Sequence, residues 1–280
     1  MAVVMKRRQF CKIIGASTAG TIAFGSTAAA HSHAGEVSTR GHFDIGWGGV
    51  ELTGGHDETD FDTDGIPGYD EGDPPSELVV MVHGFMNDES SARQTFGDTA
   101  DGLRANDYDS PVVGFSWDSD WSLFQWWSAT EIARRNGPKL AAFLNDYERQ
   151  AGGTTVRLVA HSLGAQAMLS ALDALREGDG TRPASLSLLG AAVEDQTVAV
   201  DGAYGPAVAT QVGQADNFWK SDDGVLAAFG GVEFDGALGR YGAEGETPDN
   251  YEDHQVDYVN DHNSYYLADG GCLHEVVAEW

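Results

Sequence analysis

Ser162 lies in a stretch of sequence that favours a reactive hydroxyl. Residues 156–164 read Val-Arg-Leu-Val-Ala-His-Ser-Leu-Gly, so an apolar run of strand length ends at the serine, and a helical apolar stripe follows. A serine on a sharp strand-to-helix turn can attack a carbonyl, and small neighbours such as Ala160 and Gly164 let strand and helix pack closely. The pattern predicts a serine nucleophile, with Ala160 in place of the usual glycine. The side chain of His161 should project away from the serine, so we expect a structural role for it.

A second turn with a glycine follows an earlier apolar run. Leu78–Val82 is strand-like and leads into His83-Gly84-Phe85-Met86. Together with the serine turn, this segment resembles the α/β-hydrolase superfamily, in particular its esterase and lipase-like members, over roughly residues 77–274. The resemblance implies acyl transfer, with the backbone N–H groups of Phe85 and Leu163 stabilising the oxyanion. His83 is then expected to support the loop.

The resemblance also implies a histidine base late in the chain, after the acid. His262 follows a short strand-like run at 255–259 and precedes two tyrosines, so we expect it to take the proton of Ser162. The alternative bases are His254 and His274.

The acid is expected shortly before that histidine, after one more strand. The chain reads Ser-Asp-Asp-Gly-Val-Leu at 221–226, and relatives show a similar pattern around their acid. Asp223 is therefore expected to orient the imidazole and to stabilise its cation. The alternative acids are Asp222, Glu194 and Asp195.

These residues require a sheet to bring them together, and the chain alternates strand-like and helical patterns. The strand-like runs are Leu78–Val82, Val112–Ser116, Val156–Ala160, Leu186–Ala192 and Ala207–Val212. Helical spacing is found at Leu140–Tyr147, with Pro138 suited to a first turn, at Leu163–Leu175, and at Cys272–Glu279. The pattern predicts an α/β-hydrolase fold, an α/β architecture whose mostly parallel central sheet is covered by helices on both faces.

The chain divides into three predicted parts. Residues 1–30 contain Lys-Arg-Arg near the start, a short apolar stretch and Ala28-Ala29-Ala30, which is typical of a twin-arginine signal peptide. Residues 31–76 form a loop-rich acidic lead-in with a hairpin expected at Phe43–Leu52, and residues 77–280 form the catalytic domain. We expect a secreted protein, with retention at the cell surface and an uncleaved N-terminal anchor as the alternatives.

The charge of the chain indicates adaptation to high salt. Lys and Arg total 16 against 44 Asp and Glu, for a net charge of -28. Beyond the predicted signal the only lysines are Lys139 and Lys220. Such a surface repels itself at low salt and is screened at molar salt, which favours a haloarchaeal type of protein. Nucleic acid and anionic membranes carry the same sign and are not expected partners. We expect a monomer, and no integral membrane segment in the mature chain.

Two further patterns give weaker evidence for functional sites. Trp117, Trp121 and Trp126 crowd one stretch and could line a pocket for an ester or lipid substrate, or pack as core. The second is an acidic loop with the spacing of a calcium loop, in which a solvated acidic surface is the simpler interpretation. Its candidate ligands are Asp60, Asp62, Asp64 and Glu71. We therefore expect no cofactor and no metal.

Taken together, the residues predict a secreted, salt-adapted serine hydrolase that cleaves carboxylic esters. The same machinery would also serve an amidase, a thioesterase or a peptidase. A secreted binding protein or adhesion module on a hydrolase scaffold is the alternative from another class.

Overall fold

The computed structural model describes residues 33–120, 125–176, 180–229 and 236–280. The predicted signal peptide and the pocket residue Trp121 lie outside the described residues. Within the described part, no helix combines the length and the apolar character needed to cross a membrane.

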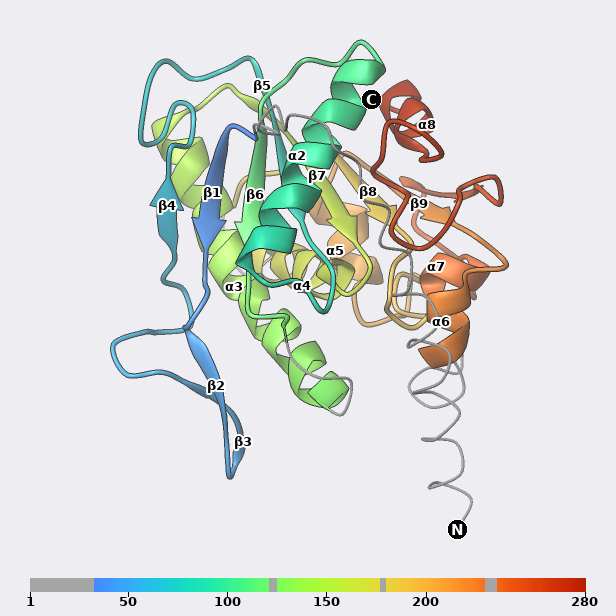
Figure 1. Ribbon diagram of the computed structural model, residues 1–280, viewed down its shortest axis with the longest axis horizontal. Helices are drawn as coiled ribbons and strands as arrows, with labels where there is room; N and C mark the ends of the chain where they lie inside the picture. The colour runs from blue at the N-terminus through green and yellow to red at the C-terminus, as the bar shows by residue number, and fades with distance from the viewer. Residues whose placement is uncertain (1–32, 121–124, 177–179, 230–235) are drawn as a thin grey trace, which may run out of the picture.

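The centre of the molecule is an eight-stranded sheet (Figure 1). Its strands, in sheet order, are β10 (Tyr251–Gln255), β9 (Gln214–Trp219), β8 (Ser185–Leu189), β7 (Thr155–His161), β5 (Glu77–Val82), β6 (Val112–Ser116), β1 (Gly35–Ser38) and β4 (Asp62–Asp64). Neighbouring strands are parallel except at the edge, where β4 is antiparallel to β1. The carboxyl ends of the parallel strands therefore meet at one edge of the sheet, where loops can bring distant residues together.

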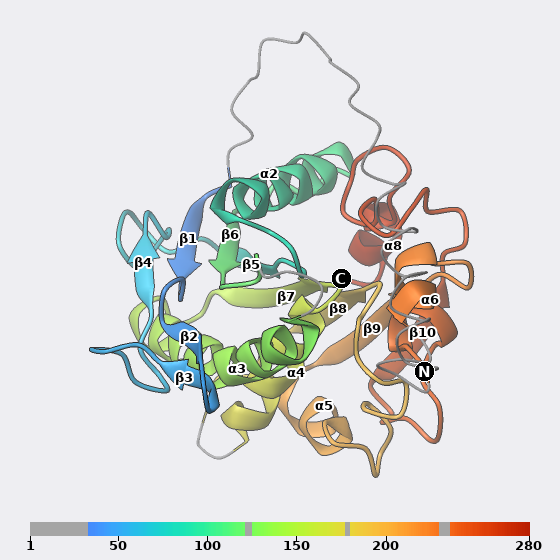
Figure 2. The same cartoon turned by 60° about the horizontal axis from the view of Figure 1, so that its bottom comes forward.

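Helices cover both faces of this sheet (Figure 2). One face carries α3 (Trp126–Gln150), α4 (Gly164–Leu175) and α5 (Gly205–Gln211), and the other carries α2 (Glu89–Ala105) and α8 (Leu273–Ala278). Two short helices, α6 (Gly224–Phe229) and α7 (Leu238–Tyr241), follow β9. The predicted α/β-hydrolase architecture is confirmed.

Strand β5 shows why these sequences form buried parallel strands. Its residues 78–82 are fully buried, and alternate side chains pack into different cores. Val80 belongs to the core beneath α3 and α4, whereas Val79 and Met81 belong to the core beneath α2 and α8. Because both faces are covered, the strand is a continuous apolar run with no polar alternation.

The lead-in is more ordered than its loop-rich composition indicates. It supplies β1 and β4 to the main sheet, and its hairpin consists of β2 (Phe43–Gly46) and β3 (Gly49–Leu52), as expected. Thr39 Oγ1 donates to Asn136 Oδ1 of α3 at 2.5 Å. Residues 33–64 are therefore part of the packed fold.

Two predicted strands lie at positions where the structure has no strand or only the end of one. Ala207–Val212 lies mostly in helix α5, because Pro206 favours a first helical turn and only Val212 is extended. The strand that precedes the predicted acid is β9 instead. The strand expected at 255–259 lies earlier, because β10 ends at Gln255. The chain turns at Val256, whose carbonyl accepts the N–H of Val259.

Helix α3 contains Pro138 in its interior, although the sequence suggested a first turn. A proline cannot donate to the carbonyl four residues earlier, here that of Arg134. Ser170 Oγ of α4 donates to this carbonyl at 2.8 Å. The two helices approach each other closely beside it: a Cβ on Gly137 would lie 2.5 Å from Ser170 Cβ and 2.6 Å from the Ser170 carbonyl carbon.

We predict that Gly137→Ala lowers the melting temperature by roughly 2–8 °C. Overpacking costs about 1–3 kcal/mol, and the better helix propensity of alanine returns only part of that. Thermal unfolding followed by circular dichroism measures the change. Glu148→Ala, at an exposed position of the same helix, is the control and should melt like the parent. A Gly137→Ala protein as stable as the parent would contradict this packing.

Candidate active site

Ser162 stands on the turn between β7 and α4 with a positive φ of 54°. This conformation costs free energy in any residue but glycine, and here the surroundings impose it. The Ser162 N–H donates to the Leu189 carbonyl at 3.0 Å, and its carbonyl accepts from Ala192 N–H at 3.1 Å. A Cβ on Gly164 would lie 2.7 Å from the backbone oxygens of β5 and its turn, so the helix can begin here only with glycine.

His262 lies in the loop after β10 and reaches the serine. Its Nε2 is 2.9 Å from Ser162 Oγ, and its Nδ1 is 2.7 Å from Asp223 Oδ2. The serine and histidine are 7% and 6% exposed. The fold therefore joins three residues spread over a hundred positions into one hydrogen-bonded chain.

Asp223 is fully buried between β9 and α6. Its Oδ1 accepts the N–H groups of Val225 and Leu226, both at 3.0 Å. Burial opposes ionisation, but His262 and these hydrogen bonds outweigh it and lower the pKa of Asp223. The carboxylate is therefore ionised at neutral pH and can orient the imidazole.

The alternative acids lie elsewhere. Asp222 is 73% exposed and pairs with Lys220 instead. The carboxylate of Asp195 packs against Gly236, and burial raises its pKa. Glu194 is exposed.

The two alternative bases are also away from the serine. His254 on β10 bonds Asp216, and His274 is 55% exposed beside Tyr258. Of the late histidines, only His262 lies within hydrogen-bonding distance of Ser162 Oγ.

The backbone N–H groups of Phe85 and Leu163 have no acceptor among the described residues. Both lie beside the serine, because Leu163 follows it directly and a Cβ on Gly84 would be 2.9 Å from Ser162 Cβ. Two free donors at a nucleophile can stabilise an oxyanion, with each typically contributing a few kcal/mol.

His83 fixes the turn that carries Phe85. Trp117 N–H donates to its Nε2 at 3.1 Å, so the proton is on Nδ1, which donates to the Gly84 carbonyl at 2.9 Å. Complete burial lowers the pKa of His83 to about 3, and the ring is neutral. It acts as the expected support of the loop.

Arg40 is a further support that the sequence did not reveal. Its Nε donates to Ser116 Oγ at 2.7 Å, and its Nη2 donates to the Asn87 carbonyl at 3.1 Å. Asn87 Nδ2 in turn donates to the carbonyls of Gly84 and Phe85, both at 3.2 Å. The lead-in thus braces the turn at Phe85, and a lone arginine in a loop gave no signal of this.

His161 lies beneath His262. Its Nε2 is 2.6 Å from the His262 carbonyl and therefore donates to it. Complete burial, reinforced by the charge of His262, lowers the pKa of His161 to about 3. The neutral ring holds the backbone of the loop that carries the base.

The two predicted pocket tryptophans that the structure describes lie in different surroundings. Trp117 is fully buried, stacks on His83 and belongs to the core, which is the alternative that the sequence left open for it. Trp126 packs edge-to-face on Phe85 with ring centroids 5.3 Å apart, next to the free N–H.

The calcium candidates do not converge. Asp62 and Asp64 point outward from strand β4, and Asp60 binds Lys139. Glu71 belongs to a separate turn that pairs it with Pro67. Among the described residues, no potential metal group contains Asp62, Asp64 or Glu71.

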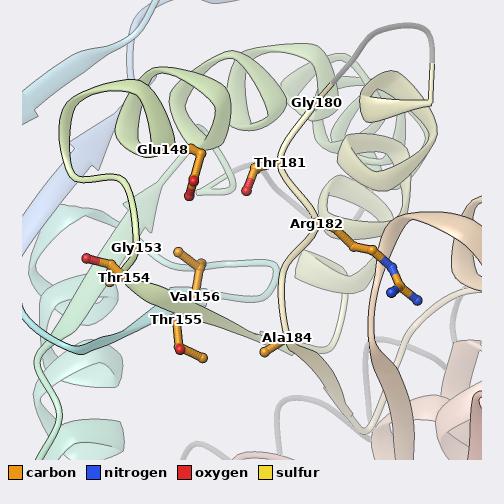
Figure 3. A pocket seen from close by; sticks show the side chains of 9 residues that line it. All are labelled: Glu148, Gly153, Thr154, Thr155, Val156, Gly180, Thr181, Arg182 and Ala184. Carbon is orange, nitrogen blue, oxygen red and sulfur yellow. The ribbon is translucent and has the colours of Figure 1, made fainter.

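A cavity of about 550 Å³ lies at the other end of β7 (Figure 3). It is lined by Glu148, Gly153, Thr154, Thr155, Val156, Gly180, Thr181, Arg182 and Ala184. Arg182 points away from it and donates to the Val212 carbonyl. Because this lining has no histidine and Ser162 is at the opposite end of the strand, the cavity is not the site of this chemistry.

One family model matches part of the chain, and it describes the same fold. The model of the family described as "Alpha/beta hydrolase of unknown function (DUF900)" matches residues 71–195, which include Gly84 and Ser162. One solved structure, "the putative cell surface hydrolase from Lactobacillus plantarum WCFS1", is similar over 73% of this chain and 90% of its own, with 9% identity and a TM-score of 0.43. No curated protein matches the sequence. The chain has the α/β-hydrolase fold, and the family match supports a hydrolase.

The buried neutral histidines predict a pH dependence of stability. His83 and His161 have pKa values of about 3, against an ordinary value of 6.5. Unfolding lets each take up a proton below pH 6.5, so their contribution is complete above that pH and is lost as the pH falls toward 3. The loss is about 1.4 kcal/mol per pH unit for each histidine.

His161→Gln should therefore make the melting temperature fall less steeply between pH 6.5 and about 4.5 than it does in the parent. The exposed His274→Gln variant serves as the matched control and should keep the parental slope. Equal slopes in all three proteins would mean that His161 is not held neutral.

Proposed function

We propose that this protein is a secreted, salt-adapted serine hydrolase that cleaves carboxylic esters. The observation that carries the proposal is the hydrogen-bonded chain from Ser162 through His262 to Asp223, beside two free backbone N–H groups. A structural serine would need neither the positive φ of 54° nor an imidazole at 2.9 Å.

The proposed reaction has two halves. Ser162 Oγ attacks the ester carbonyl carbon while His262 Nε2 takes the hydroxyl proton, and the Phe85 and Leu163 N–H groups bind the oxygen that becomes negative. His262 then gives the proton to the leaving alkoxide, and the C–O bond breaks to leave an acyl-serine. Water repeats the sequence, with His262 as base and then acid, and releases the carboxylic acid and the free serine. Asp223 stays ionised throughout and stabilises the imidazolium.

Export and salt adaptation rest on the sequence. The basic N-terminal segment followed by Ala28-Ala29-Ala30 supports twin-arginine export. The net charge of -28 supports work at high ionic strength, where the charges are screened. Kinetic tests are therefore best made in molar KCl.

We predict that Asp223→Asn lowers kcat for a p-nitrophenyl ester by about 10³- to 10⁴-fold and leaves the melting curve close to that of the parent. The amide no longer selects the imidazole tautomer that presents a free Nε2 to Ser162. Asp222→Asn changes the exposed neighbour and should keep parental activity. Full activity in Asp223→Asn, or an equal loss in Asp222→Asn, would remove the proposed acid.

The acyl preference is a separate prediction. Trp117 is part of the core, and of the predicted pocket tryptophans that the structure describes, Trp126 is the one that packs beside Phe85 at the free N–H groups. Together with the low exposure of Ser162 and His262, this favours small acyl groups. In a series of p-nitrophenyl esters, kcat/KM should be highest at about two to four carbons. A maximum at long chains would indicate a lipase, and a preference for matched amides or thioesters would replace the ester assignment.

A further inference from the structure

A second group of polar side chains lies away from the serine, on the sheet face covered by α2 and α8. Asp216 of β9 is fully buried there, and His254 of β10 lies beside it, with Nε2 at 3.0 Å from Asp216 Oδ1. Glu279, directly after α8, completes the group, in which one ligand atom from each of the three residues lies within 4.8 Å of the others.

The buried carboxylate is incompletely satisfied. Gln214 Nε2 and His254 Nε2 both reach Oδ1 of Asp216, whereas its Oδ2 has no hydrogen-bond partner in the described part of the chain. A buried carboxylate oxygen without a donor is costly unless a cation compensates it. Neither Asp216 nor Glu279 pairs with a lysine or arginine among the described residues.

The other histidine-carboxylate group of the described residues provides a contrast. His42, His56 and Asp60 also have ligand atoms close together. There, Lys139 Nζ contacts Asp60 Oδ1 and lies 3.3 Å from His42 Nδ1. That group already contains a lysine ammonium, whereas no lysine or arginine of the described residues pairs with the group at Asp216.

The spacing of the donors at Asp216 is close to that of metal ligands. Nitrogen and oxygen donors bound about 2.0–2.2 Å from a tetrahedral zinc ion lie about 3.3–3.6 Å from one another. His254 Nε2 and Asp216 Oδ1 are 3.0 Å apart, so a shift of a few tenths of an ångström would let both bind one ion. The His254 ring is held for this by stacking on Phe218, with ring centroids 4.7 Å apart.

Glu279 is held near the sheet by its neighbour. Trp280 Nε1 donates to Ser187 Oγ at 3.3 Å, and Arg157 Nη2 donates to the Trp280 carbonyl at 2.9 Å. The carboxylate of Glu279 is exposed and can close over an ion from the solvent side.

We propose that Asp216, His254 and Glu279 bind a divalent transition-metal ion of the zinc type. An imidazole with two carboxylates suits zinc better than calcium, which prefers six to eight oxygen donors. The ion would join β9, β10 and the segment after α8, and water would complete its coordination. This structural site is separate from Ser162 and does not depend on the proposed hydrolase activity.

The test uses the chelator-treated full chain in molar KCl, with Zn²⁺ as the probe and Ca²⁺ as the comparison. Zinc content is measured by mass spectrometry after gel filtration, and thermal unfolding is followed in parallel. We expect one zinc per chain and a melting temperature raised by roughly 5–10 °C at a hundredfold excess over Kd, with no comparable effect of calcium. His254→Ala should lose both effects, and the exposed Glu279→Gln should bind zinc at least tenfold more weakly.

Two matched histidine variants make the result specific. His274→Ala removes an exposed histidine, and His56→Ala removes one from the group that Lys139 already compensates. Both should keep parental zinc binding. The proposal is overturned if zinc does not bind the parent, if His254→Ala binds it equally well, if His56→Ala abolishes binding, or if calcium stabilises as much as zinc. If His254→Ala does not fold, Glu279→Gln decides, because its side chain lies in solvent.

Discussion

The strained backbone of Ser162 is the constraint on which the candidate site depends. Its positive φ lets β7 end and α4 begin within three residues, and it aims the hydroxyl at the carboxyl edge of the sheet. The loops after other strands must then supply the oxyanion donor, the acid and the base. The loop after β5 brings Phe85, the loop after β9 brings Asp223, and the loop after β10 brings His262. A parallel sheet makes this possible because all these loops leave from one edge.

The positions around this turn tolerate few amino-acid substitutions. Glycine at 84 and at 164 is required by close backbone approaches, and His83 and His161 fill the space beneath the two loops as neutral rings. Two buried imidazoles at an ionic site would be costly if charged. Burial keeps them uncharged and leaves His262 as the imidazole that meets both Ser162 and Asp223.

Much of this arrangement could be predicted from the sequence because it has local signals. Continuous apolar runs gave the central strands, and the small residues around Ser162 indicated its turn. Where the local signal is ambiguous, the prediction failed: Ala207–Val212 is as apolar as a strand, yet Pro206 starts a helix there. Trp117 shows the same difficulty, because an aromatic side chain is equally suited to a pocket and to a core.

Contacts between distant segments could not be predicted where no motif marks the residues. Nothing near Arg40 in the sequence indicates that it supports Asn87, because that contact exists only once β1 has paired with β6. The proximity of Asp216 and Glu279 likewise depends on how α8 packs against the sheet.

Covalent labelling with a fluorophosphonate tests the central claim most directly, since this reagent needs an activated serine and two oxyanion donors but no knowledge of the natural substrate. The account predicts one phosphonate per folded chain, located by peptide mass spectrometry on Ser162 and absent after heat unfolding. A folded chain that stays unlabelled, or one labelled at another serine, would contradict it.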